Sequence, residues 1–250
     1  MTTVIIGIDC ATDPKRIGIA AARRTQKGRC TVHSIGLGSD GPPLVERIAE
    51  LCQSHDRALL AMDAPLGWPH DLGRVLHNHS AGQPIAVTAN HLFRRATDRM
   101  IHERYGKLPL EVGADRIART ALAALDLLGQ IGAQLDRRGQ LAWSPALTPG
   151  LSAIEVYPAA TLLAHWNYRQ RYKRAEDRDA RQALLGHLAQ HLSLPQDCSR
   201  AIDNADILDA ILCVLAGHDF LSGRALAPPP SQRDLARHEG WIWVAERAEP

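Results

Sequence analysis

Residues Val4 to Asp9 read V-I-I-G-I-D, an apolar run that ends abruptly in a carboxylate. A continuous apolar run of this length is typical of a strand that is buried on both faces. A carboxylate placed where such a strand ends is costly to bury unpaired, so it needs either a partner or a function. The stretch therefore predicts a buried strand that carries Asp9 to a polar site.

The same pattern recurs twice further along the chain. Residues 58–62 (A-L-L-A-M) run into Asp63, and residues 151–154 (L-S-A-I) run into Glu155. In parallel sheets the carboxyl ends of neighbouring strands open onto one crevice, where ligands bind. We therefore expect Asp9, Asp63 and Glu155 to converge on one site.

Composition narrows the class of protein. The formal net charge of +2 neither demands nucleic acid as a partner nor excludes a local basic groove. The 5 cysteines are odd in number and form no CxxC pair, which favours buried thiols in a reducing compartment over a disulfide framework or a zinc site. No signal peptide opens the sequence, and no apolar run approaches the ~18 residues that cross a membrane. We expect a cytoplasmic protein.

Hydrophobic periodicity predicts the order βββαβ for the first part of the chain. Strands are expected at 4–9, 16–22 and 30–37, followed by an amphipathic helix at 44–54 and the strand that ends at Asp63. The sequence pattern changes in residues 68–150, where helices are expected at 90–105 and 114–131. We interpret this block as a mostly helical insertion, or cap, on a single domain that spans residues 1–250.

The remaining elements are predicted from residue 151 onward. A strand is expected at 151–156, and Pro158 is suited to open a helix through Trp166. The charge run 169–181 is interpreted as the exposed first half of a helix. The strongest helix prediction is 203–221, with Asp203 as the N-cap candidate. Residues 241–244 (W-I-W-V) are expected to form a last short strand, with both tryptophans on one side in core or lid packing.

Two further carboxylates lie within the apolar helix 203–221. Asp206 and Asp209 are three residues apart and so share one helical face. Acids are rarely fully buried unless they are paired or bound to metal. A cluster of carboxylates repels itself, and Mg²⁺ or Mn²⁺, which prefers oxygen ligands, resolves that repulsion; two such ions clamp both reacting oxygens of a phosphodiester.

At this point the sequence resembles a known family. The βββαβ order with acids after strands one and four and a D-x-x-D pair on a late helix resembles the RNase H-like superfamily, in which such acids hold metals for phosphodiester cleavage. More narrowly, several motifs together resemble domain of unknown function family 429, whose members are described as predicted nucleases with an RNase H fold. These motifs are G-I-D (7–9), M-D-A-P-L-G (62–67), R-R-A-T-D-R (94–99), P-L-E-V-G-A-D-R-I (109–117), I-E-V-Y-P-A-A (154–160), Y-K (172–173), D-I-L-D-A (206–210) and E-G-W-I-W-V (239–244).

The resemblance implies roles for individual residues. Asp9 matches the metal ligand of strand one, Asp63 occupies the strand-four position, and Asp209 with Asp206 matches the helix ligands. Glu155 lies in a family motif, although RNase H-like enzymes do not uniformly use an acid there. The loop 10–13 (C-A-T-D) departs from the glycines of many members, which bears on how closely a phosphate backbone approaches.

Each of these acids also has a purely structural interpretation. Asp9 would cap a turn or pair with an arginine, and Asp63 would form a turn before Ala-Pro. Asp206 would satisfy a helix start. Glu155 would pair with an arginine of the cap, which is the alternative to a catalytic role.

The basic residues allow two interpretations as well. Arg94, Arg95 and Asp98 would form either a clamp for phosphate or a solvated, charge-laced helix face, and we favour the second. The basic run 169–181 would follow a nucleic-acid backbone or form a solvated face, and Lys173 is the residue that the family pattern singles out. Arg94, Arg95 and Lys173 are the candidates for substrate binding.

These patterns lead to a hypothesis with two rivals. The favoured function is a nuclease or phosphodiesterase that depends on Mg²⁺ or Mn²⁺ and acts on nucleic acid or a phosphorylated small molecule, with Asp9, Asp63, Asp209 and Glu155 as the catalytic set. An actin-like or sugar-kinase-type phosphoryl transferase lacks the expected glycine-rich loop and second repeat here. A non-catalytic binding module on the same fold is the third hypothesis.

Overall fold

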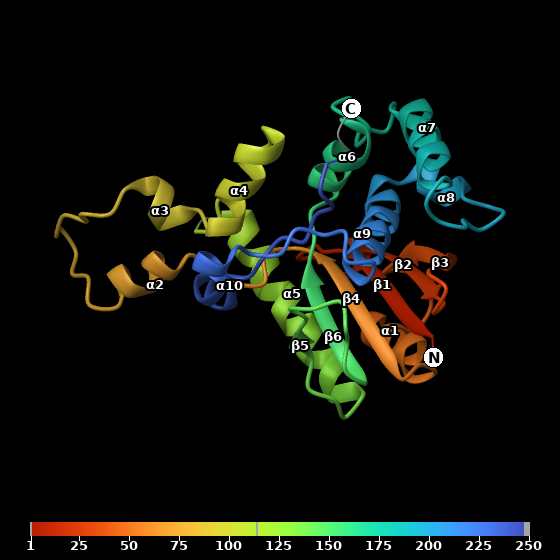
Figure 1. The fold of residues 1–250 in the computed structure, drawn as a ribbon, viewed down its shortest axis with the longest axis horizontal. Helices are drawn as coiled ribbons and strands as arrows, with labels where there is room; N and C mark the ends of the chain where they lie inside the picture. Colours follow the sequence, from red (N-terminus) through yellow and green to blue (C-terminus); the bar gives the residue numbers. More distant parts are fainter. Residues whose placement is uncertain (1, 114, 248–250) are drawn as a thin grey trace.

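A mixed β-sheet forms the centre of the computed structural model, which describes residues 2–113 and 115–247 (Figure 1). Its strands lie in the order β3-β2-β1-β4-β6-β5. β2 is antiparallel to β1 and β3, whereas β1, β4, β6 and β5 run parallel. The bounds are β1 Thr3–Asp9, β2 Gly18–Arg24, β3 Cys30–Leu37, β4 Arg57–Asp63, β5 Gln140–Leu141 and β6 Gly150–Glu155.

Helices flank this sheet on both faces. They are α1 Leu44–Gln53, α2 His70–Leu76, α3 Ala89–Phe93, α4 Ala96–Tyr105, α5 Asp115–Gln134, α6 Pro158–Trp166, α7 Arg178–Leu188, α8 Ser199–Asp203, α9 Ala205–Leu221 and α10 Arg233–Glu239. Short 3-10 turns lie at Pro14–Arg16 and Pro230–Gln232. The expected α/β fold, an RNase H-like mixed sheet in βββαβ order flanked by helices, is confirmed.

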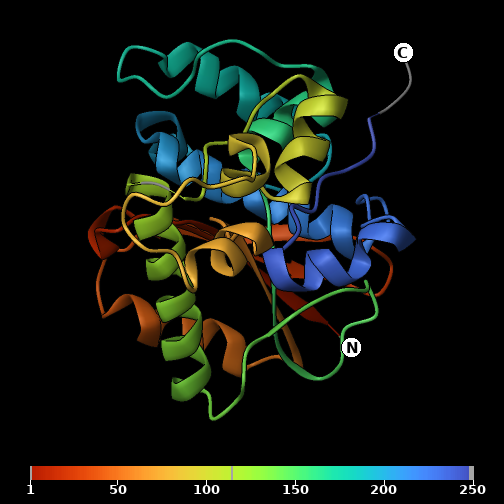
Figure 2. The same cartoon turned by 90° about the vertical axis from the view of Figure 1, so that its left-hand side faces the viewer.

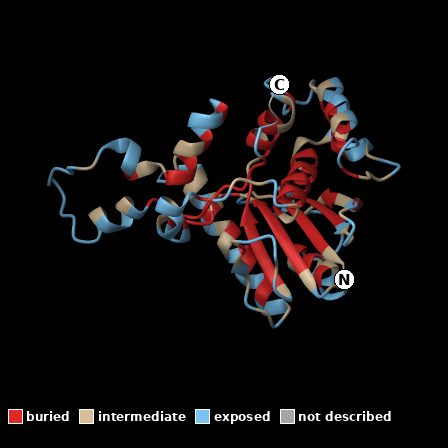
Figure 3. Cartoon of the chain, in the orientation of Figure 1, coloured by how far each residue is buried: buried red, intermediate tan, exposed pale blue. Residues whose placement is uncertain are grey.

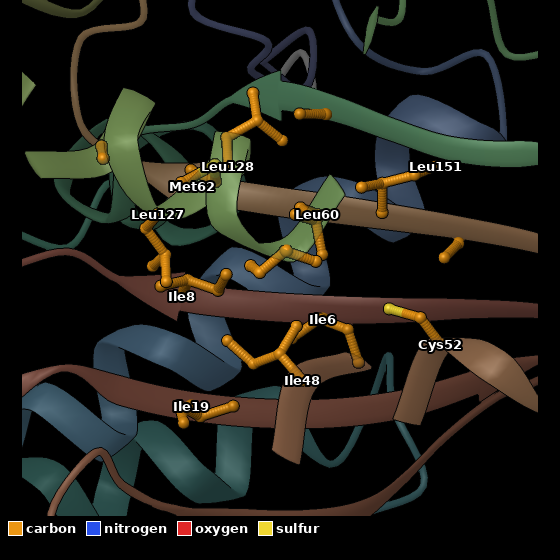
Figure 4. Packing of buried hydrophobic residues seen from close by; sticks show 14 of the residues in the cluster. Ile6, Ile8, Ile19, Ile48, Cys52, Leu60, Met62, Leu127, Leu128 and Leu151 are labelled. Atoms are coloured by element: carbon orange, nitrogen blue, oxygen red, sulfur yellow. The ribbon is translucent and has the colours of Figure 1, made fainter. Parts of the chain in front are cut away.

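One face of the sheet packs against α1 and α5. Ile6 and Ile8 of β1 and Leu60 of β4 interleave there with Ile48 of α1 and Leu127 of α5, as Figure 4 shows. Side chains of a strand alternate between the two faces, so the same strands also present a second apolar face. α5 therefore belongs to the layer that covers the sheet, although it lies within the segment 68–150.

The opposite face of the sheet is covered by α9. This helix is buried almost all round, with Ile207, Ile211 and Leu215 packed among residues of β1, β2, α7 and α8. Gly18 of β2 makes the approach possible, because a Cβ there would lie 2.0 Å from the Asp206 carbonyl oxygen. Burial on this scale is the main favourable term that fixes α9 to the sheet.

The segment that contains α2 and α3 projects away from the sheet in Figure 1 and faces the viewer in Figure 2. Figure 3 shows this segment largely exposed, in contrast to the buried strands and α9. The prediction of one long helix at 90–105 is wrong, because the structure has two helices there, α3 and α4. Arg94 and Arg95 are extended between them, and the Asp98 side chain accepts from Arg95 N at 2.9 Å, which starts α4 anew.

Three further expectations need correction. Residues 169–177 are not helical, because α7 begins only at Arg178, and the buried Arg181 side chain instead donates to the carbonyls of Tyr172 and Arg174. α9 is capped by Asn204 rather than Asp203, which closes the separate helix α8. Residues 241–244 do not form a strand, since only Ile242 makes an isolated bridge, to Glu155, although both tryptophans are buried in the core.

The remaining boundaries differ little from the predicted ones. β3 and α6 have the predicted bounds. The helix expected from residue 114 is α5; its predicted first residue lies outside the described part of the chain. Within residues 2–113 and 115–247, no helix combines the length and apolarity that crossing a bilayer requires.

Candidate active site at the carboxyl ends of the central strands

Asp9 and Asp63 lie side by side at the ends of β1 and β4. The parallel register pairs their Cα positions directly, Asp9 with Asp63. The expected convergence of strand-end acids is therefore built into the register of two neighbouring strands. Burial raises the pKa of Asp9, and the two carboxyl groups are near enough that the charge of Asp63 raises it further.

α9 adds a third carboxylate from above the sheet. Asn204 accepts from the amides of Asp206 and Ile207, and so fixes the first turn of the helix. Asp209, one turn further on, is fully buried, and Tyr172 donates its hydroxyl to Asp209 Oδ1 at 2.7 Å. Asp206 is half-buried at the edge of the same group.

Lys173 supplies the compensating positive charge. Its Nζ lies 2.5 Å from Asp209 Oδ2, while 61% of the Lys173 side chain remains exposed. Despite this contact, Asp209 Oδ2 is buried without an aligned hydrogen bond. The ammonium group therefore touches the carboxylate from the solvent side without satisfying its hydrogen-bonding capacity.

Burial and mutual repulsion make the carboxylates reluctant to ionise together. Burial, then the charges of Asp209 and Asp63, raise the pKa of Asp9 well above its usual range. Burial and Asp209 raise the pKa of Asp63 to about 7. Burial also raises the pKa of Asp209, although Lys173 acts in the opposite direction. A cluster in this state has a deficit of positive charge.

The donor chemistry of this cluster fits a hard divalent cation, since the groups that Asp9, Asp63 and Asp209 offer are all carboxylate oxygens. The side chains are not gathered as a finished coordination site. Within the part of the chain that the structure describes, no group of three or more His, Cys, Asp or Glu side chains is arranged to hold a metal ion. A metal ion bound to Asp209 Oδ2 would have to displace the Lys173 ammonium group, which contacts that oxygen.

Glu155 ends β6 beside these acids but has a different partner. Arg95 Nη1 and Nη2 donate to its two carboxylate oxygens at 2.7 and 2.6 Å, and Leu66 N donates to Oε2 at 3.0 Å. Arg95 also donates to both oxygens of Asp98. Glu155 is thus fully paired, and through Leu66 it holds the loop that follows Asp63.

The arginines of the insertion do not form the exposed helix face that we favoured from the sequence. Arg95 is 1% exposed and its guanidinium is fully occupied by Glu155 and Asp98. Arg94 pairs instead with Glu111 at 2.7 Å and is half-buried. The exposed-face interpretation fails because Glu155 and Glu239, distant in sequence, cover the start of α4.

Two pockets adjoin the carboxylates. A pocket of about 390 Å³ is lined by Asp63 and Lys173 and by the apolar or aromatic residues Leu110, Ile117 and Tyr157. A second, of about 500 Å³, contains Asp9 and Asp206 and shares Lys173 with the first. Three arginines that the sequence reasoning missed line this second pocket: Arg16, Arg116 and Arg119. The i, i+3 spacing of the last two at the start of α5 was the available signal.

The fold and the site together define an RNase H-like α/β protein with a buried carboxylate cluster at the strand ends. The chain belongs to the family described as "Protein of unknown function (DUF429)", whose model matches residues 7–233. Among solved structures it is similar to the RuvC structure of Thermus thermophilus, at 13% identity and a TM-score of 0.36, covering 88% of this chain and 96% of that one. No residue role is carried over from that protein. The search of curated proteins returned no match.

Proposed function

We propose that this protein is a phosphodiesterase, most simply a nuclease, that works with Mg²⁺ or Mn²⁺ at the carboxylate cluster. The observation that carries the proposal is the in-register pair of Asp9 and Asp63 beneath the fully buried Asp209. Buried acids gathered with too little positive charge are costly in an inert protein, and they become useful when a cation joins them.

The four aspartates have distinct tasks in this proposal. Asp9, Asp63 and Asp209 would hold the metal, with Asp206 at the outer edge of the set. Tyr172 fixes the orientation of Asp209 by its hydrogen bond to Oδ1. A bound divalent ion supplies a low-pKa water and charge stabilisation at phosphorus.

Basic residues around the cluster are placed to bind the phosphate of a substrate. Arg16, Arg116 and Arg119 are exposed and line the pocket that contains Asp9. Lys173 stands between that pocket and the one beside Asp63. Guanidinium groups bind phosphate oxygens in pairs and so position the scissile group over the acids.

Glu155 and Arg95 are assigned a positioning role rather than direct contact with metal or substrate. Arg95 donates to both oxygens of Glu155 and to both oxygens of Asp98, and the Leu66 amide joins Glu155 to the loop that leaves Asp63. The guanidinium group is therefore already occupied by buried carboxylates, whose charge it compensates. This differs from the catalytic role for Glu155 and the substrate-binding role for Arg95 that the sequence suggested.

The test combines metal binding with cleavage. Mn²⁺ binding is measured by calorimetry on the wild type, on Asp9→Asn and on Glu50→Gln, which changes an exposed acid of α1. The same proteins are incubated with labelled DNA and RNA, single-stranded, duplex and branched, in Mn²⁺, in Mg²⁺ and in EDTA. Metal-dependent cleavage that is lost in Asp9→Asn and kept in Glu50→Gln is the expected result.

Two outcomes would count against nuclease activity of this protein. Cleavage that persists equally in Asp9→Asn would come from another enzyme and would leave this one without activity. No Mn²⁺ binding and no cleavage by the wild type would overturn the proposal. Cleavage of one polymer alone identifies the substrate.

A further inference from the structure

A second cationic pocket lies at the opposite end of the sheet from the carboxylate cluster. It measures about 620 Å³ and is formed where β4 and β6 begin and where the chain leaves α5. Its lining includes three arginines, Arg57, Arg137 and Arg138. Arg57 begins β4 and Asp63 ends it, so the two sites are roughly 20 Å apart along one strand. Figure 1 shows β4 running from one end of the sheet's strands to the other.

The arginines of this pocket lack acidic partners. Among the ion pairs of the described residues, none involves Arg57, Arg137 or Arg138. One carboxylate, the exposed Asp56, lies in the lining, but it is not paired with them. Three cations against one acid leave the pocket with net positive charge.

Two guanidinium nitrogens in the pocket are buried without an acceptor. Arg57 Nε and Arg137 Nη1 are inaccessible to solvent and make no hydrogen bond within residues 2–113 and 115–247. Buried donors of a charged group are normally satisfied, and an exception requires an explanation. Arg57 and Arg137 of this pocket thus each carry a guanidinium nitrogen that no protein acceptor satisfies, and Arg94 Nε, elsewhere in the fold, is a further such nitrogen.

The backbone holds these arginines in place. After α5 ends at Gln134, Asp136 adopts a left-handed conformation with φ of 48°, and Arg137 N donates to Gly132 O at 2.9 Å. This turn closes the helix and directs the chain to the pocket. Arg57 is held by the pairing of β4 with Thr3 and Gly150. Neither arginine depends on a long flexible loop for its position.

Polar neutral groups complete the lining. Thr148 and Ser152 contribute hydroxyl groups, and Gln140 contributes an amide. Guanidinium groups beside hydroxyl and amide donors match the oxygens of a phosphate group, which offers several acceptors around one centre. A carboxylate offers fewer acceptors than the donors gathered here.

We infer that this pocket is a binding site for a phosphate group, separate from the carboxylate cluster and independent of metal. Arg57 and Arg137 would donate to its oxygens, and Arg138 would add charge at the rim. The phosphate would belong either to a free small molecule or to the backbone of a nucleic acid. The inference does not rest on the function proposed for the carboxylate site.

Binding is tested by calorimetry in EDTA at constant ionic strength, with inorganic phosphate, pyrophosphate, a mononucleotide and a short single-stranded oligonucleotide as separate probes. The wild type is expected to bind at least one of them saturably, with a component that depends on Arg57 and Arg137. Arg57→Gln and Arg137→Gln should each weaken binding about tenfold or more, because each removes a paired charged donor. Arg116→Gln, which changes an arginine of the pocket beside Asp9, should leave the component that depends on Arg57 and Arg137 unchanged, which separates the two sites.

A matched control removes one arginine elsewhere. Arg29→Gln changes an exposed arginine in the turn between β2 and β3, and binding should stay within about twofold of the wild type by general charge alone. Arg137→Lys keeps the charge but not the planar fork, and intermediate affinity is expected. Circular dichroism confirms that each variant is folded.

Several results would overturn the inference. They are absence of saturable binding of all four probes by the wild type, equal weakening in Arg29→Gln, or unchanged affinity in folded Arg57→Gln and Arg137→Gln. Saturable binding of inorganic phosphate identifies a free phosphorylated molecule as sufficient. Binding of the oligonucleotide alone, lost in the two arginine variants, identifies a nucleic-acid backbone.

Discussion

Gly7 of β1 lies directly against Ala210 of α9, and a Cβ added to Gly7 would lie 2.1 Å from the Ala210 carbonyl oxygen. The Val214 amide nitrogen would be 2.8 Å from the same Cβ. Asp9 follows Gly7 by two residues, and Asp209 immediately precedes Ala210. The absence of a side chain at Gly7 therefore sets how closely these two carboxylates approach.

Replacing Gly7 with alanine should push α9 away from the sheet. Overpacking against backbone atoms costs about 1–3 kcal/mol or more, so the free energy of unfolding should fall by at least that amount. Mn²⁺ affinity should fall as well, because Asp209 moves with α9. Urea denaturation and calorimetry measure the two effects.

Gly129→Ala is the matched control for this change. Gly129 lies in α5 with no atom near the position of an added Cβ, so alanine should stabilise the protein by about 0.5–1 kcal/mol. Equal effects of the two substitutions would show that close packing at Gly7 is not what holds α9 against β1.

Removing either Arg95 or Glu155 should lower the free energy of unfolding, because each is buried and paired with the other. Arg95→Met leaves Glu155 and Asp98 buried without their cation, and such breaks cost about 3–5 kcal/mol. Arg94→Met removes a pair with the more exposed Glu111, which should cost about 0–1 kcal/mol. Urea denaturation of the two variants gives the comparison, and similar small losses would contradict the assigned role.

The positioning role of Glu155 makes a separate prediction about metal binding. Glu155→Gln should unfold at lower urea concentration yet bind Mn²⁺ within about threefold of the wild type, since it removes half of an ion pair and no ligand. Asp9→Asn should do the reverse and lose Mn²⁺ binding. If folded Glu155→Gln loses Mn²⁺ altogether, Glu155 is a ligand and the ion pair with Arg95 opens on binding.

The parts of the fold that the sequence predicted are those decided by local patterns. Apolar runs that end in Asp9 and Asp63 indicated neighbouring strands, and Pro158 marked the start of α6 correctly. Asp206 and Asp209 were placed on one face by helical spacing alone. Such features need no knowledge of distant contacts, because burial and periodicity leave their mark within a few residues.

The errors that concern the site arise mostly from contacts between distant residues. Arg95 was interpreted as exposed because helix spacing does not reveal that Glu155, 60 residues away, reaches its guanidinium. The run 169–177 was interpreted as helical, but the Arg181 side chain holds its carbonyls in an irregular turn. The pairing of Lys173 with Asp209 was likewise beyond reach, although both residues had been singled out separately.

Lys173 should compete with a metal ion for the carboxylates. Its Nζ contacts Asp209 Oδ2 at 2.5 Å, so Lys173→Met should lower stability without metal and tighten Mn²⁺ binding about tenfold or more, because a cation repels a divalent ion at short range. Calorimetry and urea denaturation measure the two effects. Lys107→Met, which changes an exposed lysine of the adjoining pocket, is the control and should alter neither quantity appreciably. Weaker Mn²⁺ binding in Lys173→Met would show that the ammonium helps to assemble the site instead.

His218 of α9 should give the protein a pH-dependent stability that is separate from the carboxylate cluster. It is 7% exposed, and its Nδ1 accepts from Arg24 Nε at 3.3 Å, as the neutral ring does. Burial and Arg224 lower the pKa of His218 from 6.5 to about 4, while Asp219 acts against them and Arg24 and His191 add to the lowering. His218 is therefore protonated near pH 6.5 in the unfolded chain, but only near pH 4 in the folded protein. The contribution of His218 to stability is complete above this window and is lost progressively as the pH falls through it.

His218→Gln isolates this contribution, because the amide keeps an acceptor for Arg24 but does not titrate. The variant should be less stable than the wild type at about pH 7.5, and its deficit should shrink at about pH 5, where the wild type alone loses this contribution. Urea denaturation at the two pH values gives the difference of differences, and His91→Gln, at an exposed position of α3, provides the baseline for removing a histidine. A deficit that stays constant between the two pH values would mean that the folded protein protonates His218 as readily as the unfolded chain does.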